Sequence, residues 1–197
     1  MSEDDPGADD DREDDPGADD DREDDPGADG GRENDPERFE RLPATADERG
    51  VEGRATRQEV VDFWDERFGV PPETFEAFTF WEKGAGKVWA LHGDAPSPIE
   101  VEALGMTFLR TRQEHWKPTT DAVQRFGRAA TENVIELPRE HARRFVAGED
   151  LEPEWDGDWG YLIVAHELVG GLEPLGVGLF TYGTLQSMVP KGRRRDL

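Results

Sequence analysis

The sequence contains no cysteine. Disulfide bonds, thiolate zinc sites and cysteine nucleophiles are therefore excluded. The chain also has no apolar run of membrane-spanning length, and its acidic start, Met1–Asp4, is the opposite of a secretory signal. We therefore expect a cytoplasmic protein with no membrane partner.

Lysine is scarce as well. The 23 basic residues face 47 acidic residues, which gives a formal net charge of −24, and the lysines are Lys83, Lys87, Lys117 and Lys191. This composition favours the hypothesis of an acidic, halophilic protein that stays soluble in high salt. An RNA-binding protein from a salty cytoplasm need not be basic overall, so the net charge does not exclude nucleic acid.

Large apolar side chains are missing from the start of the chain. Residues 1–33 carry 17 acidic residues and 3 arginines, and the decapeptide EDDPGADDDR at Glu3–Arg12 recurs at Glu13–Arg22 and, altered, at Glu23–Arg32. Such a segment cannot bury a core, so we predict that residues 1–54 form a disordered acidic repeat followed by a linker, which docks through Phe39 and Leu42. A solubilising role is favoured over a metal-binding or nucleic-acid-mimicking one.

Ordered structure is predicted from Thr56 onward. Thr56 and Glu59 fit a capping box that begins a helix ending at Gly69. A β-hairpin is expected over 78–92, and Ser97-Pro98 is a further helix start. The remaining patterns predict strands at 106–112, 133–137, 160–166, 175–182 and 184–189 and helices at 120–128 and 138–147.

These elements predict a mixed α+β fold. We expect a small N-terminal lobe over 55–98 and, over 99–197, a small mixed β-barrel with short helices packed outside.

The most informative motifs lie near the end of the chain: Gly160–Val164 (GYLIV), Glu173–Leu179 (EPLGVGL) and Met188–Arg194 (MVPKGRR). In this order they resemble the PUA-like domain of Sun-family RNA cytosine-C5 methyltransferases, and also the PUA tail of a ribosome-biogenesis factor family. The resemblance covers roughly 99–197, with a weaker match of 56–98 to the lobe that precedes PUA domains. It implies a PUA-like fold that binds RNA.

Two basic patches stand out against the acidic background and indicate phosphate contacts. Residues 110–128 have a net charge of +3, and a second patch closes the chain. The candidate RNA-binding residues of the first patch are Arg110, Arg112, His115, Trp116, Lys117, Arg125 and Arg128. Those of the second are Lys191, Arg193 and Arg194.

Three of the candidate positions carry an alternative. Trp116 either stacks on an unpaired base or fills the core. Gly176 and Gly178 leave one face of a strand bare, which marks either a bend in a barrel or an approach of the RNA backbone. Both interpretations stay open at the level of sequence.

Catalysis is not predicted. Cytosine-C5 methylation needs a cysteine, and Gly84-Ala85-Gly86 belongs to a hairpin rather than to a loop that binds a methyl donor. The four histidines show no paired ligand spacing, and neither serine near a strand end has a nucleophile-elbow context. We therefore expect no enzyme activity, no cofactor and no metal.

The leading hypothesis is a monomeric, non-catalytic module that binds ribosomal or transfer RNA, in ribosome biogenesis or as an accessory to a separate RNA methyltransferase or ribosome-assembly protein. The alternative is a protein-interaction adaptor that docks on an RNA-modification enzyme subunit. Its contact patch would consist of exposed aromatic side chains on the N-terminal lobe: Phe75, Phe78, Phe80 and Trp81.

Overall fold

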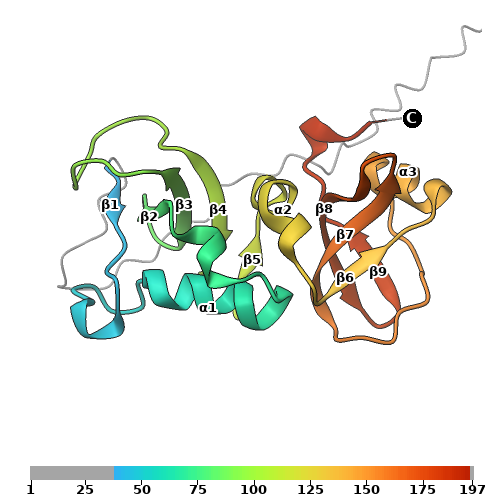
Figure 1. Cartoon of the computed structure of the whole chain (residues 1–197), viewed down its shortest axis with the longest axis horizontal. Coiled ribbons are helices and arrows are strands. Elements are labelled where there is room, and N and C mark those ends of the chain that lie inside the picture. The colour runs from blue at the N-terminus through green and yellow to red at the C-terminus, as the bar shows by residue number, and fades with distance from the viewer. Residues whose placement is uncertain (1–37, 196–197) are drawn as a thin grey trace, which may run out of the picture. The chain divides into compact units, whose positions relative to one another are not determined.

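The computed structural model describes residues 38–195 and contains two β-sheets with three α-helices (Figure 1). The first sheet has the order β1-β2-β3-β4-β5, formed by Glu40–Arg41, Phe78–Glu82, Lys87–His92, Met106–Arg110 and Lys117–Pro118. The second has the order β6-β7-β8-β9, formed by Val134–Glu136, Gly160–Leu168, Gly171–Thr181 and Thr184–Ser187. The α-helices are α1 (Arg57–Phe68), α2 (Thr120–Phe126) and α3 (Arg139–Ala147). The prediction for the repeat at 1–33 lies outside the described residues.

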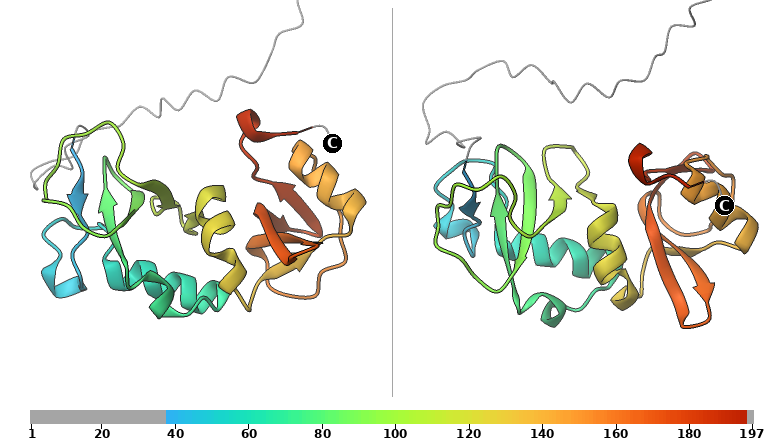
Figure 2. Two further views of the ribbon diagram at one scale, coloured as in Figure 1. Left: turned by 45° about the horizontal axis from the view of Figure 1, so that its top comes forward. Right: turned by 90° about the horizontal axis from the view of Figure 1, so that it is seen from above.

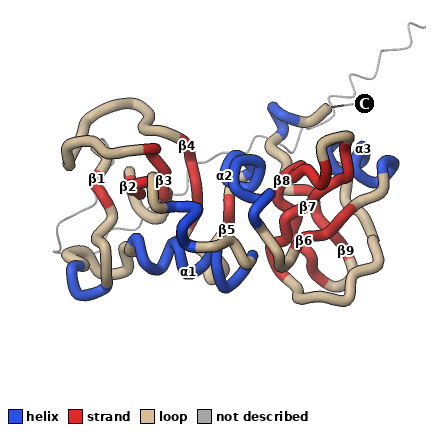
Figure 3. The backbone as a smooth tube through the Cα atoms, in the orientation of Figure 1, coloured by secondary structure: helices blue, strands red, loops and turns tan. Residues whose placement is uncertain are grey.

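The predicted α+β class is confirmed, but the predicted barrel is wrong. Within residues 38–195 neither sheet closes on itself, because β6 and β9 remain the two edges of the second sheet. Figure 3 shows the strands of this sheet in red. Strand β6 pairs in parallel with β7, while β9 pairs with β8 and forms one isolated bridge with Leu151. Four strands, with edges of three and four residues, are too few and too short to close around a core.

Helix α1 forms where the capping box predicts it. The Thr56 side chain accepts a hydrogen bond from the Glu59 backbone, and the Glu59 carboxylate accepts one from the Thr56 backbone. Gly69 ends the helix in the left-handed conformation. The helix buries Val60, Val61, Trp64 and Phe68 in the main hydrophobic core.

The segment before α1 belongs to the fold rather than to a linker. Phe39 and Leu42 are buried, as expected for docking, but Glu40 and Arg41 also add strand β1 to the edge of β2. Phe39 and Ile99 exchange two backbone hydrogen bonds of 2.8 and 3.0 Å. The predicted helix after Ser97 is therefore wrong, since Ile99 is held in an extended bridge.

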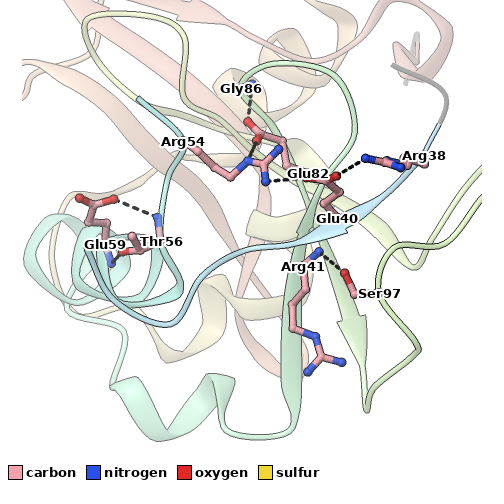
Figure 4. A network of polar contacts seen from close by, with 9 residues as sticks. All are labelled: Arg38, Glu40, Arg41, Arg54, Thr56, Glu59, Glu82, Gly86 and Ser97. Atoms are coloured by element: carbon pink, nitrogen blue, oxygen red, sulfur yellow. Dashed lines mark hydrogen bonds and ion pairs between the residues drawn. The ribbon is translucent and has the colours of Figure 1, made fainter. Parts of the chain in front are cut away.

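A polar network joins this N-terminal segment to the β2–β3 hairpin (Figure 4). Arg54 donates to Glu82 at 2.8 Å and to Glu40 at 2.7 Å, and the backbone of Gly86 donates to Glu82 at 2.6 Å. Burial raises the pKa of Glu82 even though Gly86 and Arg54 stabilise its charged form. Because its partners are hydrogen-bonded, this buried carboxylate fixes the hairpin against the chain that precedes α1.

The first sheet extends beyond the predicted lobe boundary at 98/99, since β4 and β5 continue from β3. Helix α2 follows and lies between β4 and β8, as two further views show (Figure 2). Its Phe126 joins the aromatic cluster of the first sheet, while Gln124 donates to the Leu175 carbonyl of β8 at 2.9 Å. We propose that the boundary between the lobes lies after α2, near residue 130.

The aromatic patch required by the adaptor hypothesis is not at the surface. Phe75, Phe78, Phe80 and Trp81 are all buried. Strand β2 is covered on both faces, by the α1 core on one side and by Phe39 and Leu104 on the other. In the part of the chain that is described, no helix is long and apolar enough to cross a bilayer.

Candidate functional site

The two predicted basic patches meet at one surface pocket of about 320 Å³. Arg110 and Lys117 come from β4 and β5, and Arg193 comes from the short 3-10 helix η4 (Lys191–Arg193). We call this the basic pocket; its other lining residues are Thr107, Pro118, Thr119, Thr120, Asp121, Met188 and Pro190.

Local structure explains why the pocket forms. Arg110 and Lys117 are direct cross-strand partners in the antiparallel β4–β5 pair, so their side chains leave the same face of the sheet. The Thr119 hydroxyl donates to the Thr107 carbonyl at 2.7 Å and accepts from the Ala122 backbone at 3.1 Å. It thereby fixes the turn from β5 into α2, which forms the wall opposite η4.

Lys117 is a half-buried cation without an acidic partner. Burial lowers its pKa, and the neighbouring positive charge of Arg110 lowers it further. Among residues 38–195, no carboxylate forms an ion pair with Lys117 or Arg110. Two adjacent unpaired cations, one of them half-buried, cost free energy that a bound anion would offset.

Arg193 reaches the pocket through an ion pair. Its two terminal nitrogens donate to the two carboxylate oxygens of Asp121, at 2.6 and 3.0 Å. This bidentate pair ties η4 to the start of α2 and raises the pKa of Arg193. Because both side chains are partly solvent-exposed, the pair contributes little stability and Arg193 can turn toward an incoming phosphate.

The other predicted cations are dispersed. Arg112 is exposed in the β4–β5 loop and packs beside Gly86. Arg125 lies over the ring of Phe78, and Arg128 forms a bidentate pair with Glu173. Lys191 and Arg194 are exposed near the end of the described chain, where Arg194 donates to the Val189 carbonyl at 3.3 Å. The structure thus brings Arg110, Lys117 and Arg193 together in the basic pocket, and the other predicted cations do not line it.

Gly176 and Gly178 do not offer a bare strand to RNA, and we remove them from the interface. Both are buried. A Cβ atom at Gly178 would lie 2.5 Å from Leu185 and 2.9 Å from Val164, and one at Gly176 would lie 3.4 Å from Thr120. The missing side chain at Gly178 makes room for Leu185 and Val164, whereas a Cβ atom at Gly176 would be in ordinary contact with Thr120.

Trp116 is half-buried and packs against Phe63, with ring centroids 5.7 Å apart. Of its two interpretations, this contact favours packing against the core. His115 is exposed and contacts the ring of Trp159 edge to face at 4.9 Å. The sequence reasoning missed Trp159. The available signal was a tryptophan between an acidic loop and the first glycine of a strand, outside any apolar periodicity.

Comparisons with known proteins match two segments of the chain. Residues 132–195 match the model described as the methyltransferase RsmF PUA domain, and residues 21–105 match a family of unknown function, DUF7122. A curated relative, the ribosomal RNA small subunit methyltransferase F of Aeromonas salmonicida (strain A449), is 26% identical over 106 residues. That alignment covers 54% of this chain and 21% of the relative, so the chain spans about a fifth of the relative's length.

Proposed function

The chain contains a PUA-like domain at residues 132–195, and from this premise we propose that it is a non-catalytic RNA-binding module. Its RNA is ribosomal or transfer RNA, and it acts in ribosome biogenesis or as an accessory to an RNA methyltransferase. The similarity to part of a ribosomal RNA methyltransferase supports this direction. The matched PUA model at residues 132–195 supports binding rather than chemistry.

The observation that carries the proposal is the basic pocket. In a chain with 47 acidic residues, Lys117 and Arg110 stand together without a carboxylate partner among the described residues. Surplus acids are the simplest way to neutralise a structural lysine, so an unpaired, half-buried lysine beside an arginine favours a negatively charged ligand. Phosphates of an RNA backbone supply that charge.

We test this by measuring the affinity of the full chain for single-stranded ribosomal RNA fragments across a KCl series. Each lost phosphate contact should reduce the slope of log K against log salt by about 0.7. Lys117→Gln and Arg110→Gln should therefore weaken binding of all fragments alike and flatten the salt dependence. Arg143→Gln makes the same charge change on α3, outside the basic pocket, and should leave the slope close to that of the parent.

Thermal unfolding of each variant establishes that the fold is intact. If Lys117→Gln and Arg110→Gln fold normally and keep the affinity and slope of the parent, the basic pocket is not the RNA site. If the parent itself fails to bind RNA at any salt concentration, the RNA-binding function is wrong.

A second candidate function, the adaptor, is favoured by a different surface. Leu168, Val169 and Leu172 are exposed at the tip of the β7–β8 hairpin, with Val169 fully accessible. Exposed apolar clusters of this kind mark protein contacts. Co-purification of a partner after nuclease treatment, abolished by Val169→Asp, would support the adaptor; retention of that partner by the variant would exclude this surface.

A further inference from the structure

Two aromatic side chains stand out of the surface beside one another. Trp159, just before β7, is 62% exposed, and Tyr182, in the β8–β9 turn, is fully exposed at 106%. Together with Thr181 they line a pocket of about 420 Å³. Trp159 is also a wall of a second pocket of about 490 Å³, which contains His115, Trp116 and Tyr161.

Tyr182 occupies a backbone conformation that its side chain does not favour. Thr181 pairs with Thr184, so Tyr182 and Gly183 form a two-residue hairpin loop, and their φ angles are 50° and 82°. Two consecutive positive φ angles define the turn type in which Asn-Gly is preferred. A tyrosine at the first position is strained, and its exposed ring gains no packing in return.

Trp159 is held in place by its backbone rather than by burial of its ring. The Arg67 guanidinium donates to the Trp159 carbonyl at 2.9 Å and to the Tyr161 carbonyl at 3.0 Å. The imidazole of His115 contacts the indole at an interplanar angle of 83°. The indole is thereby oriented while most of its surface stays open, which is the property of a preformed stacking surface.

The surrounding charges indicate which ligand fits. The pocket beside Trp159 is lined by Asp158 and Glu114 and by one cation, Arg67, which lies 3.7 Å from Asp158. The surplus carboxylate disfavours a phosphate, whereas a neutral, planar ring with amino groups suits both the aromatic walls and the carboxylates. We assign phosphates to the basic pocket, which the next residue of the chain helps to line. Trp116 and Lys117 are adjacent residues, and one lines the aromatic pocket while the other lines the basic pocket.

We propose that Trp159 and Tyr182 form a stacking platform that binds unpaired nucleobases of single-stranded RNA. The inference rests on the proposed RNA-binding function and adds a second subsite whose ligands are unpaired nucleobases. The basic pocket holds the backbone, and the platform holds bases exposed by the absence of a complementary strand.

The test compares a single-stranded oligoadenylate with an abasic strand of the same length, at fixed KCl concentration. The parent protein should prefer the strand with bases. Trp159→Ala and Tyr182→Asn should each weaken oligoadenylate binding about 5-fold or more, leave abasic binding unchanged and keep the salt slope. Trp159→Phe should restore much of the preference. Val169→Ala removes another exposed apolar side chain and should change neither affinity.

Tyr182→Asn separates function from folding. Because Asn-Gly suits this turn, the variant should unfold at a higher temperature than the parent while it binds oligoadenylate more weakly. A loss of binding by misfolding would instead lower both quantities.

Each result has a defined meaning. If Trp159→Ala keeps the preference for bases while Lys117→Gln flattens the salt slope, the platform is wrong and the RNA-binding function stands. If the parent binds neither strand, the proposed function fails and the platform with it. Equal binding of both strands, together with a co-purified protein that Trp159→Ala releases, would assign the platform to a protein and overturn the proposal.

Discussion

The Glu59 carboxylate makes the stability of the start of helix α1 depend on pH. Burial alone would raise its pKa, but the hydrogen bond from the Thr56 backbone at 2.9 Å and the contact with Arg49 lower it below the ordinary value of 4.5. A carboxyl whose pKa is lower in the folded state adds stability above its unfolded pKa. That contribution is lost as the pH falls through the folded pKa.

Glu59→Gln should therefore flatten the acid limb of the stability profile. The variant is expected to be less stable than the parent at neutral pH, by about 1 kcal/mol from the weakened cap, and the difference should shrink below pH 4.5. Urea unfolding at a series of pH values measures it. Glu66→Gln changes an exposed carboxylate of the same helix and should leave the profile unchanged. Parallel curves for Glu59→Gln and the parent would contradict the assignment.

Residue-level reasoning from sequence succeeded where the interaction is local. Thr56 and Glu59 lie three residues apart, so their reciprocal hydrogen bonds could be predicted. Arg110, Lys117 and Arg193 could each be named as cations, but their convergence could not, because Arg193 reaches Asp121 across 72 residues of chain. The pairing of Arg128 with Glu173 is hidden from sequence for the same reason.

At the scale of elements, strand β8 needs a glycine at position 178, because neighbouring side chains occupy the space that a side chain there would take. The contacts around Gly178 involve Val164, whose β-branched side chain has little freedom to move, and Leu185, which is fully buried. Gly178→Ala should therefore destabilise the protein by about 1–3 kcal/mol through overpacking.

Thermal and urea unfolding measure the effect of Gly178→Ala. Gly192→Ala is the matched control, since a Cβ atom there meets nothing within 4 Å and its φ is not positive. Unchanged stability of Gly178→Ala would mean that the β8–β9 hairpin relaxes freely, and would reopen the position to other contacts.

Sequence patterns predicted the longer elements and missed the two-residue strands β1 and β5. Helix α1 and the β2–β3 hairpin carry clear periodicity over several residues. Strand β1 has two residues and no period to detect, and pairing with β2 and the burial of Phe39 hold it in place. Sheet closure was predicted wrongly because it depends on which strands become edges, which no local pattern encodes.

For the whole molecule, the net charge of −24 predicts opposite effects of salt on two measurements. Repulsion among the carboxylates weakens the folded state, so screening by KCl should raise the unfolding temperature. The same screening should weaken RNA binding at the basic pocket. A salt series of thermal unfolding curves beside the binding series checks both. An unfolding temperature that falls as KCl rises would contradict the first expectation.

Helix α2 gives the two halves of the described chain a common interior. Ile163 of β7 and Val177 of β8 belong to the same hydrophobic cluster as Trp64 and Phe108 of the first half. A gene fusion that carried residues 132–195 alone would inherit these apolar side chains without their cover. We therefore expect the two lobes to unfold together rather than one after the other, because they share this part of the core.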